Sequence, residues 1–248
     1  NKSEEWQKFD LDAQAGKIVV DENNYKWIIT PQTSSVGIIV YDDNNTPLNI
    51  FDDRSISLTS SEGNGKLINN NVVSLSLDKD GEMWIGTTQG ICVIRNTRKV
   101  FDASGSFDAE RLIITQGNNT DYLLGDETIN AIETDGGNRK WIGTAGSGLF
   151  LMSESGTQQI AHFKTDNSPL ISDNILDIVI NGESGEVFIA TDKGLIAYRS
   201  DATNGVENEV GEPLVFPNPV RPDHEGPIAV KGIRAESDDK ITDIPGNI

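Results

Sequence analysis

The stretch NVVSLSLDKDGEMWIGTTQGICVIR, residues 71–95, determines the fold of this chain. It contains three short apolar segments, Val72–Leu77, Met83–Thr87 and Ile91–Ile94, which are rich in β-branched residues and predict three strands. Lys79-Asp80-Gly81 separates the first two segments. An Asp-Gly dipeptide in this position predicts a tight primed turn, because glycine readily takes the positive φ that such a turn requires. The stretch is therefore predicted to form consecutive strands joined by tight turns.

The same arrangement occurs in three further places. The copies cover residues 16–41, 72–95, 128–152 and 174–198, and their marker aromatic residues are spaced by 57, 57 and 47 residues. Self-similarity on this scale is typical of repeat architectures, and each strand-rich unit predicts one four-stranded propeller blade. The repeat signature comprises Trp27, Trp84, Gly86, Thr87, Trp141, Gly143, Thr144 and Phe188.

The predicted fold class is all-β. Residues 1–200 are predicted to form about four antiparallel, four-stranded blades of a β-propeller, the C-terminal half of a larger ring. Residues 201–212 are a polar linker. Residues 213–248 are rich in proline and begin a small β-sandwich domain, which has too few apolar side chains to bury a core of its own.

Outer strands are predicted in the polar connections that follow each set of three strands. They are expected at Ile56–Leu58, Arg111–Thr115 and Gln158–Lys164. Residues 1–15 are interpreted as the outer strand of a preceding blade, with Trp6 and Phe9 as buried side chains.

The strands are apolar on both faces because each blade is covered by its two neighbours. Along WIGT, the Trp and Gly positions face one side of the strand and the Ile and Thr positions face the other. We expect the Trp to fill the space between blades and the Gly to allow a neighbour to approach closely. Unless four blades close alone, the apolar end faces of this unit would recruit a second copy.

Composition excludes several classes of function. The net charge of −19, from 39 acidic and 20 basic residues, argues against nucleic acid as a partner, because phosphate binding requires a Lys/Arg surface. No apolar run is long enough to span a membrane as a helix. Cys92 is the single cysteine, so no intrachain disulfide forms, and its apolar surroundings predict a buried, inert thiol.

The acidic turns are the first candidate sites. They begin at Asp21, Asp78, Asp135 and Asn181. A calcium loop would need a longer series of ligands that ends in a bidentate acid, and none is present, so these segments are interpreted as turns between strands, with no metal or cofactor expected.

Other motifs give little support for catalysis. His162 lies in a predicted outer strand and His224 in the proline-rich tail, and neither has an evident nucleophile or metal-ligand spacing, so no catalytic residues are assigned. GTAGSG at residues 143–148 has no helix after it and is interpreted as a turn, not a phosphate loop. Asn69-Asn70-Asn71 is interpreted as a loop into an inner strand, with a ligand site at the central channel as the alternative.

The pattern N-x-V…D-x-D-G-x-x-W-I-G-T…G-I, from Asn71 to Ile91, resembles the two-component regulator propeller repeat. The resemblance covers about residues 14–200. It implies seven-bladed propellers, often in tandem, in the extracytoplasmic part of hybrid sensor kinases of Bacteroidetes.

The C-terminal segment, residues 213–248, resembles part of a different family of proteins. Pro217-Asn218-Pro219, directly after the last blade, is similar to the opening of a type IX secretion C-terminal domain. A propeller followed by such a domain resembles the PorZ-like surface propellers of type IX secretion. This resemblance implies a non-enzymatic scaffold at the outer-membrane surface or in the periplasm, with other secretion or surface proteins, glycan or lipopolysaccharide as partners. A ligand-sensing domain of a hybrid two-component receptor is the alternative, and an enzyme is the third hypothesis.

Overall fold

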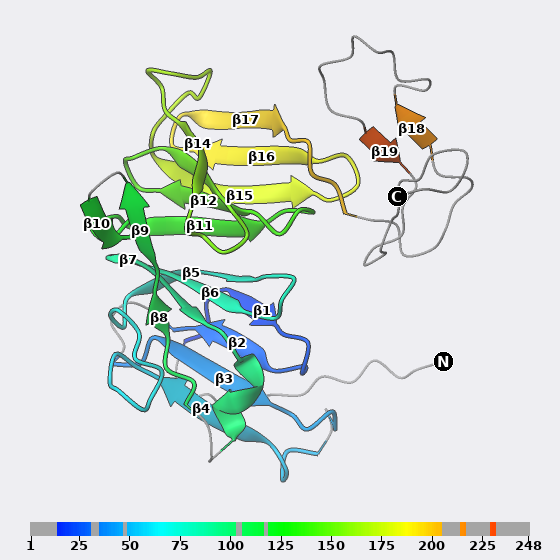
Figure 1. The fold of residues 1–248 in the computed structure, drawn as a ribbon. Coiled ribbons are helices and arrows are strands. Elements are labelled where there is room, and N and C mark those ends of the chain that lie inside the picture. The colour runs from blue at the N-terminus through cyan, green and yellow to red at the C-terminus, as the bar shows by residue number, and fades with distance from the viewer. Residues whose placement is uncertain are drawn as a thin grey trace, which may run out of the picture.

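The computed structural model describes residues 14–30, 35–46, 49–102, 106–116, 119–204, 214–216 and 229–231. Within these ranges the chain forms three four-stranded antiparallel sheets and one three-stranded sheet. The sheets lie side by side as consecutive blades of a β-propeller (Figure 1). In each blade the strands neighbour one another in sequence order. The predicted all-β propeller fold is therefore confirmed.

The strand bounds follow the sequence repeat closely. Blade 1 consists of β1 (Ile18–Val20), β2 (Lys26–Ile29), β3 (Ile38–Asp42) and β4 (Arg54–Leu58). Blade 2 consists of β5 (Val72–Leu77), β6 (Met83–Thr87), β7 (Gly90–Ile94) and β8 (Glu110–Arg111). Blade 3 consists of β11 (Ile129–Thr134), β12 (Lys140–Thr144), β13 (Leu149–Met152) and β14 (Gln159–Phe163). Blade 4 consists of β15 (Ile175–Asn181), β16 (Glu186–Thr191) and β17 (Gly194–Arg199).

A 3-10 helix and two pairs of strands lie outside the blades. A 3-10 helix, η1 (Thr97–Phe101), follows β7, and a hairpin of β9 (Ile113–Gln116) and β10 (Asn119–Tyr122) follows β8. In the tail, β18 (Leu214–Phe216) pairs with β19 (Ala229–Lys231).

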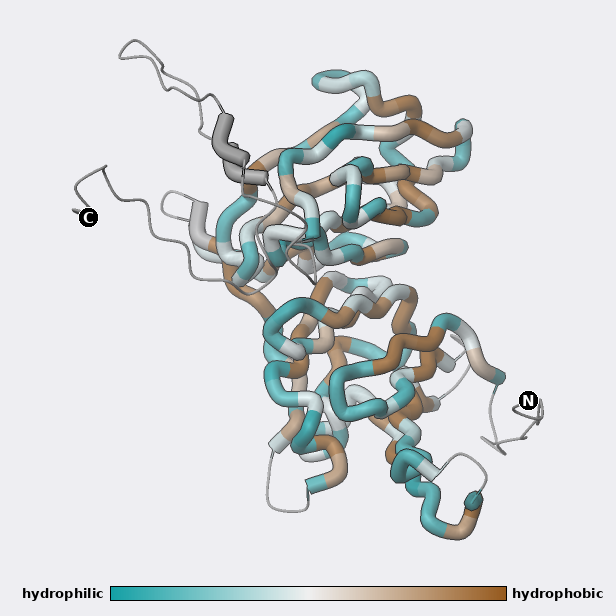
Figure 2. Tube along the Cα trace, turned by 90° about the vertical axis from the view of Figure 1, so that its right-hand side faces the viewer, coloured by the Kyte–Doolittle hydropathy of each residue, from teal (hydrophilic) through white to brown (hydrophobic). Residues whose placement is uncertain are grey.

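The core consists of the spaces between blades. Trp27, Trp84 and Trp141 are each fully buried, and every residue of β6 and β12 is buried, as expected for strands that are covered on both faces. Hydrophobic stretches of the trace run along the strands, whereas hydrophilic stretches gather in the turns and connections (Figure 2).

The two faces of each blade contact different neighbours. Trp84 packs in a cluster with Ile132 and Ile142 of blade 3, whereas Ile85, the next residue along β6, packs in a cluster with Trp27 of blade 1. Gly86 lies on the Trp84 side, where a Cβ atom would be only 2.7 Å from Ile129 Cγ2. The glycine of WIGT therefore permits the close approach of the next blade.

The turn between the first two strands of blade 2 differs from the predicted primed type. Gly81 has a φ of +75°, but among the described residues of this turn it is the single residue with positive φ, whereas a type I′ turn needs two in succession. The Gly81 N–H donates to Asp78 O and the Asp78 N–H donates to Glu82 O, so the turn spans three residues between Asp78 and Glu82. The longer turn gives the Asp78 side chain room to fold over it.

The outer strand of blade 2 also differs from the prediction of Arg111–Thr115. Its pairing with β7 ends at Arg111, and the residues after Leu112 form β9 of the separate hairpin. Leu112 causes this change in direction, because its side chain is 4% exposed within the Trp84 cluster and its carbonyl accepts a hydrogen bond from Leu123 N. The hairpin is therefore an insertion between the outer strand of blade 2 and the inner strand of blade 3.

Several predictions fall on residues outside the described ranges. They concern Trp6 and Phe9 in the N-terminal segment, Pro217, Asn218 and Pro219 in the tail, and His224. The domain division at residues 200 and 213 stays a prediction.

Substitution of Gly143 by alanine should destabilise the protein. The new Cβ would lie 2.5 Å from Ile175 Cγ2 and 2.9 Å from Ile175 Cβ of blade 4, and overpacking of this kind costs about 1–3 kcal/mol. Urea unfolding followed by tryptophan fluorescence would measure the loss. Gly146→Ala is the matched control, because its Cβ would meet no atom within 4 Å. Equal midpoints for the two variants would contradict the close approach of blades 3 and 4.

Candidate functional site

A buried aspartate organises the first turn of each tryptophan-bearing blade. In blade 2, Asp78 Oδ1 accepts hydrogen bonds from Asp80 N (3.0 Å) and Glu82 N (2.9 Å), and Asp78 Oδ2 accepts one from Trp84 Nε1 (2.9 Å). One carboxylate thus closes the turn and also satisfies the indole N–H, which the blade interface has removed from water.

The same arrangement is present in blades 1 and 3. Trp27 Nε1 donates to Asp21 Oδ2 at 3.0 Å, and Trp141 Nε1 donates to Asp135 Oδ2 at 3.1 Å. In all three blades the aspartate stands six residues before the tryptophan. The interpretation of these segments as turns is correct, but the bond to the indole was missed, although the constant D-x₅-W spacing could have indicated it.

Blade 4 departs from this arrangement at both positions. Asn181 occupies the place of the aspartate, and its Oδ1 atom accepts hydrogen bonds from the backbone of Glu183 and Ser184. Phe188 replaces the tryptophan, so no indole N–H needs a partner. The neutral amide of Asn181 therefore closes the turn without the negative charge that the aspartate carries in the other blades.

The threonine of the signature has a second structural role. Thr87 Oγ1 donates to Gly90 O (3.0 Å) and accepts from Gln89 N (3.0 Å), while Thr144 Oγ1 donates to Gly148 O (2.9 Å) and accepts from Ser147 N (2.9 Å). These bonds close the turn between the second and third strands. The signature residues are thus used for packing and turn closure, and a binding function has to be sought elsewhere.

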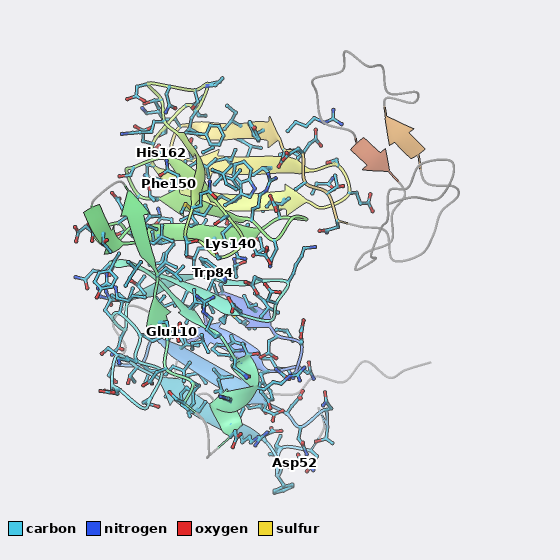
Figure 3. The ribbon with its side chains drawn as sticks, in the orientation of Figure 1. Asp52, Trp84, Glu110, Lys140, Phe150 and His162 are labelled. Carbon is cyan, nitrogen blue, oxygen red and sulfur yellow. The ribbon has the colours of Figure 1, made fainter. Side chains whose placement is uncertain are left out.

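Lys140 links blades 2 and 3 from a fully buried position. Its Nζ atom lies 3.0 Å from Asp78 Oδ2 and 4.9 Å from the centre of the Trp84 ring, and it donates to Asn138 O and Glu154 O. Figure 3 shows Lys140 beside Trp84 at the boundary between the two blades. Both charges of this ion pair are buried, so each charge needs the other to offset its loss of contact with water.

A polar hollow lies beside the inserted β9–β10 hairpin. It has a volume of about 400 Å³ and is lined by Ile114, Asp121, Tyr122, Leu124, Gly125, Asp126 and Glu127. Insertions in repeat proteins map to loops on one face, which is often the binding face. This hollow is therefore the candidate ligand site.

The hollow is held in shape by contacts on both sides. The Arg111 guanidinium stacks at 3.8 Å over the Tyr122 ring, and Glu127 accepts a hydrogen bond from Ser147 Oγ. Leu124 has a φ of +49°, a conformation that costs free energy in a bulky residue and is often found at functional sites. An aromatic ring and three carboxylates therefore lie around a pre-formed depression. Such groups can stack on a ligand and accept its hydrogen bonds.

The remaining sequence candidates have structural partners. His162 Nε2 lies 2.7 Å from Ser147 O, and its ring stacks on Phe150 (Figure 3). Asn69 Nδ2 donates to Thr88 Oγ1 and to Gln89 Oε1, which fixes the loop before β5 to the turn after β6. Of residues 143–148, the first two belong to β12, and residues 145–148 connect β12 to β13.

The described part of the chain contains no group of three or more His, Cys, Asp or Glu residues arranged to hold a metal ion. It also contains no helix that is both long and apolar enough to cross a membrane.

Comparisons with known proteins support the repeat and the fold. Residues 66–89 match the family model of the two component regulator propeller. The chain carries a two-component regulator propeller repeat. No curated protein sequence matches the chain.

Two solved structures illustrate the likeness. The structure of PorZ from Porphyromonas gingivalis, described as an essential bacterial surface component of the type IX secretion system, aligns with 90% of this chain at 28% identity and a TM-score of 0.69. An extracellular domain assigned to the hybrid two-component system BT3049 of B. thetaiotaomicron aligns with 75% of this chain at 23% identity and a TM-score of 0.55. The similarity to the BT3049 domain shows a common fold alone. The chain spans 30% of the PorZ structure and 22% of the BT3049 domain.

Substitution of Asp78 by asparagine should destabilise the protein more than the same change at Asp135. The first change leaves the fully buried Lys140 ammonium without its counter-charge, and removal of one partner from a buried pair costs about 3–5 kcal/mol. The ionic partner of Asp135 is Arg139, whose side chain is 19% exposed and also reaches Asp201. Urea unfolding would compare the two variants, and Asp78→Asn combined with Lys140→Met should recover part of the loss. Equal destabilisation by the two single changes would contradict this role of Lys140.

Cys92 should not react with thiol reagents while the protein is folded. Burial raises the pKa of its thiol to about 11, so very little thiolate exists at neutral pH, and the side chain is fully buried. Titration with Ellman's reagent should detect one thiol per chain in urea and almost none in buffer. Rapid labelling of the native protein would contradict the burial of Cys92.

Proposed function

We propose that this chain is part of a non-enzymatic, extracytoplasmic propeller scaffold that takes part in protein secretion, or in attachment of cargo, at the bacterial cell surface. The similarity to PorZ carries the proposal, because it extends over 90% of the chain at 28% identity. A role as a scaffold also agrees with the use of the signature residues, which stabilise the blades and leave the loops for binding.

The charges of the candidate hollow narrow the choice of partner. Asp121, Asp126 and Glu127 lie on its lining, and the whole chain has a net charge of −19. An anionic lipopolysaccharide would be repelled by these carboxylates. The charge therefore favours a secretion or surface protein, or a glycan without acidic groups, as the molecule bound at this hollow.

Tyr122→Ala tests the scaffold function in cells. In the source bacterium, a deletion strain should release cargo that the parent strain retains at its surface. Complementation with the Tyr122→Ala protein should restore retention less well than the unaltered protein, because the aromatic wall of the hollow is lost. Quantitative proteomics of washed cells and medium would measure the distribution of cargo.

The control for this experiment is Phe51→Ala. Phe51 is an aromatic residue that is 94% exposed in the connection between β3 and β4, away from the hollow. Complementation with the Phe51→Ala protein should restore full retention of cargo at the cell surface. An unchanged cargo distribution in the deletion strain would refute the scaffold function, whereas equal rescue by both variants would refute only the role of the hollow.

A second candidate function is ligand sensing for a two-component system, favoured by the family-model match at residues 66–89. This function expects a membrane span and a kinase domain downstream in the reading frame, while the scaffold function expects neither. It also expects saturable binding of a defined oligosaccharide, which isothermal titration calorimetry would detect.

A further inference from the structure

The connection between the third and fourth strands of a blade contacts the preceding blade, and its length differs between blades 2 and 3. In blade 2 the connection covers residues 95–109 and includes η1, which lies against blade 1 (Figure 1). In blade 3 it covers only residues 153–158, and Gly156 lies against Trp84 of blade 2. The two boundaries between blades are therefore covered differently at this place.

The η1 segment covers the first turn of blade 1 with polar and aromatic contacts. Asn23 Nδ2 donates to Thr97 Oγ1 at 3.3 Å, and Arg98 Nε donates to Asn23 Oδ1 at 3.0 Å. The Phe101 ring meets the Tyr25 ring edge-on, with 4.9 Å between the ring centroids. A hydroxyl, a guanidinium and an aromatic ring from one short turn thus occupy this part of the boundary between blades 1 and 2.

Asp80 and Glu82 occupy the corresponding positions in the first turn of blade 2. Their backbone N–H groups donate to the turn aspartate, as those of Asn23 and Tyr25 do in blade 1. The neutral amide and the phenol of blade 1 are therefore replaced by two carboxylates. This replacement makes the first turn of blade 2 a stronger acceptor for hydrogen bonds from a cation.

The short connection of blade 3 leaves a groove beside this turn, which we call the interblade groove. It has a volume of about 350 Å³ and lies between blades 2 and 3. Carboxylates, hydroxyls and one guanidinium line it, and they include those of Asp80, Glu82, Arg95, Glu154, Ser155 and Thr157. The interblade groove thus lies at the place that corresponds to the position of η1 one blade earlier.

The interblade groove is negatively charged and its carboxylates are held in place. Arg95 NH1 lies 2.6 Å from Glu82 Oε2, so the guanidinium offsets one of the three carboxylates. Asn138 Nδ2 donates to Asp80 Oδ2 at 2.8 Å and to Glu154 Oε1 at 3.4 Å, which keeps these two carboxylates close together. The charge of the groove favours a cationic guest over a neutral one, and the fixed carboxylates reduce the entropy lost on binding.

We propose that the interblade groove binds an arginine-bearing turn of a partner protein, which lies on blade 2 as η1 lies on blade 1. The partner's guanidinium donates to Asp80 and Glu154, as Arg98 donates to Asn23. Bonds to carboxylates are charge-assisted and stronger than a bond to a neutral amide, so they hold a segment that belongs to another molecule. The site is separate from the hollow at the β9–β10 hairpin, and the inference does not depend on the proposed function.

A synthetic peptide with the sequence of η1 and its flanking residues, Asn96–Asp102, is the probe for this site. In NMR titrations of the full 248-residue protein, the end-blocked peptide at millimolar concentration should shift the amide signals of Ser155 and Thr157 in a saturable way. Asp80→Asn, which restores the amide found in blade 1, and Glu154→Gln should each weaken binding about tenfold, because each removes a charge-assisted hydrogen bond. The Arg98→Gln form of the peptide should bind as weakly.

Glu183→Gln is the matched control protein. It removes one exposed carboxylate from the first turn of blade 4, away from the interblade groove, and should bind the peptide as the unaltered protein does. Thermal unfolding would verify that the two groove variants are folded. Absence of saturable shifts with the unaltered protein would overturn the proposal, as would equal affinity of the groove variants and Glu183→Gln. Shifts of the same signals by maltohexaose, without a response to the peptide, would indicate a glycan site and would also overturn it.

Discussion

The structure depends on the burial of one large indole ring at each contact between consecutive blades, Trp27, Trp84 and Trp141 in turn. This burial is favourable because the ring removes a large apolar area from water; truncation of such a residue costs about 3–5 kcal/mol. It also creates a difficulty, since the indole N–H is removed from water with the ring. The aspartate six residues earlier resolves it in blades 1, 2 and 3, where the carboxylate accepts the indole hydrogen bond and backbone hydrogen bonds of the turn.

The close packing between blades also restricts which residues can stand at two positions of the second strand. Glycine follows the tryptophan by two positions in blades 2 and 3, and a side chain there would collide with Ile129 or Ile175. Lys140 occupies the position taken by Met83 in blade 2 and extends the carboxylate system into the neighbouring blade. Its four-carbon stem fills apolar space while the ammonium reaches Asp78. The blades are therefore joined by packing and by a charge pair that is shielded from solvent.

Much of the fold was predictable, because the signal was repeated four times and each copy supported the others. The candidate hollow was much less so. The segment after Arg111 has apolar residues that continue the strand pattern, and it was interpreted as one outer strand. What ends the pairing at Arg111 is the burial of Leu112 under a neighbouring blade, and this contact is between residues distant in sequence. The glycine and asparagine residues at 117–119 were the available hairpin signal.

The sequence by itself determined that this protein is built from repeated four-stranded blades, which residues mark them, and that the chain is strongly acidic. These properties follow from local periodicity and composition, which need no knowledge of long-range contacts. Only the tertiary structure decided that Asp78 serves both its turn and the indole, that Lys140 crosses between blades, and that the β9–β10 hairpin borders a hollow. Each of these three features depends on which residues the packing of blades brings together. The pattern of apolar residues along a single strand does not specify such long-range contacts.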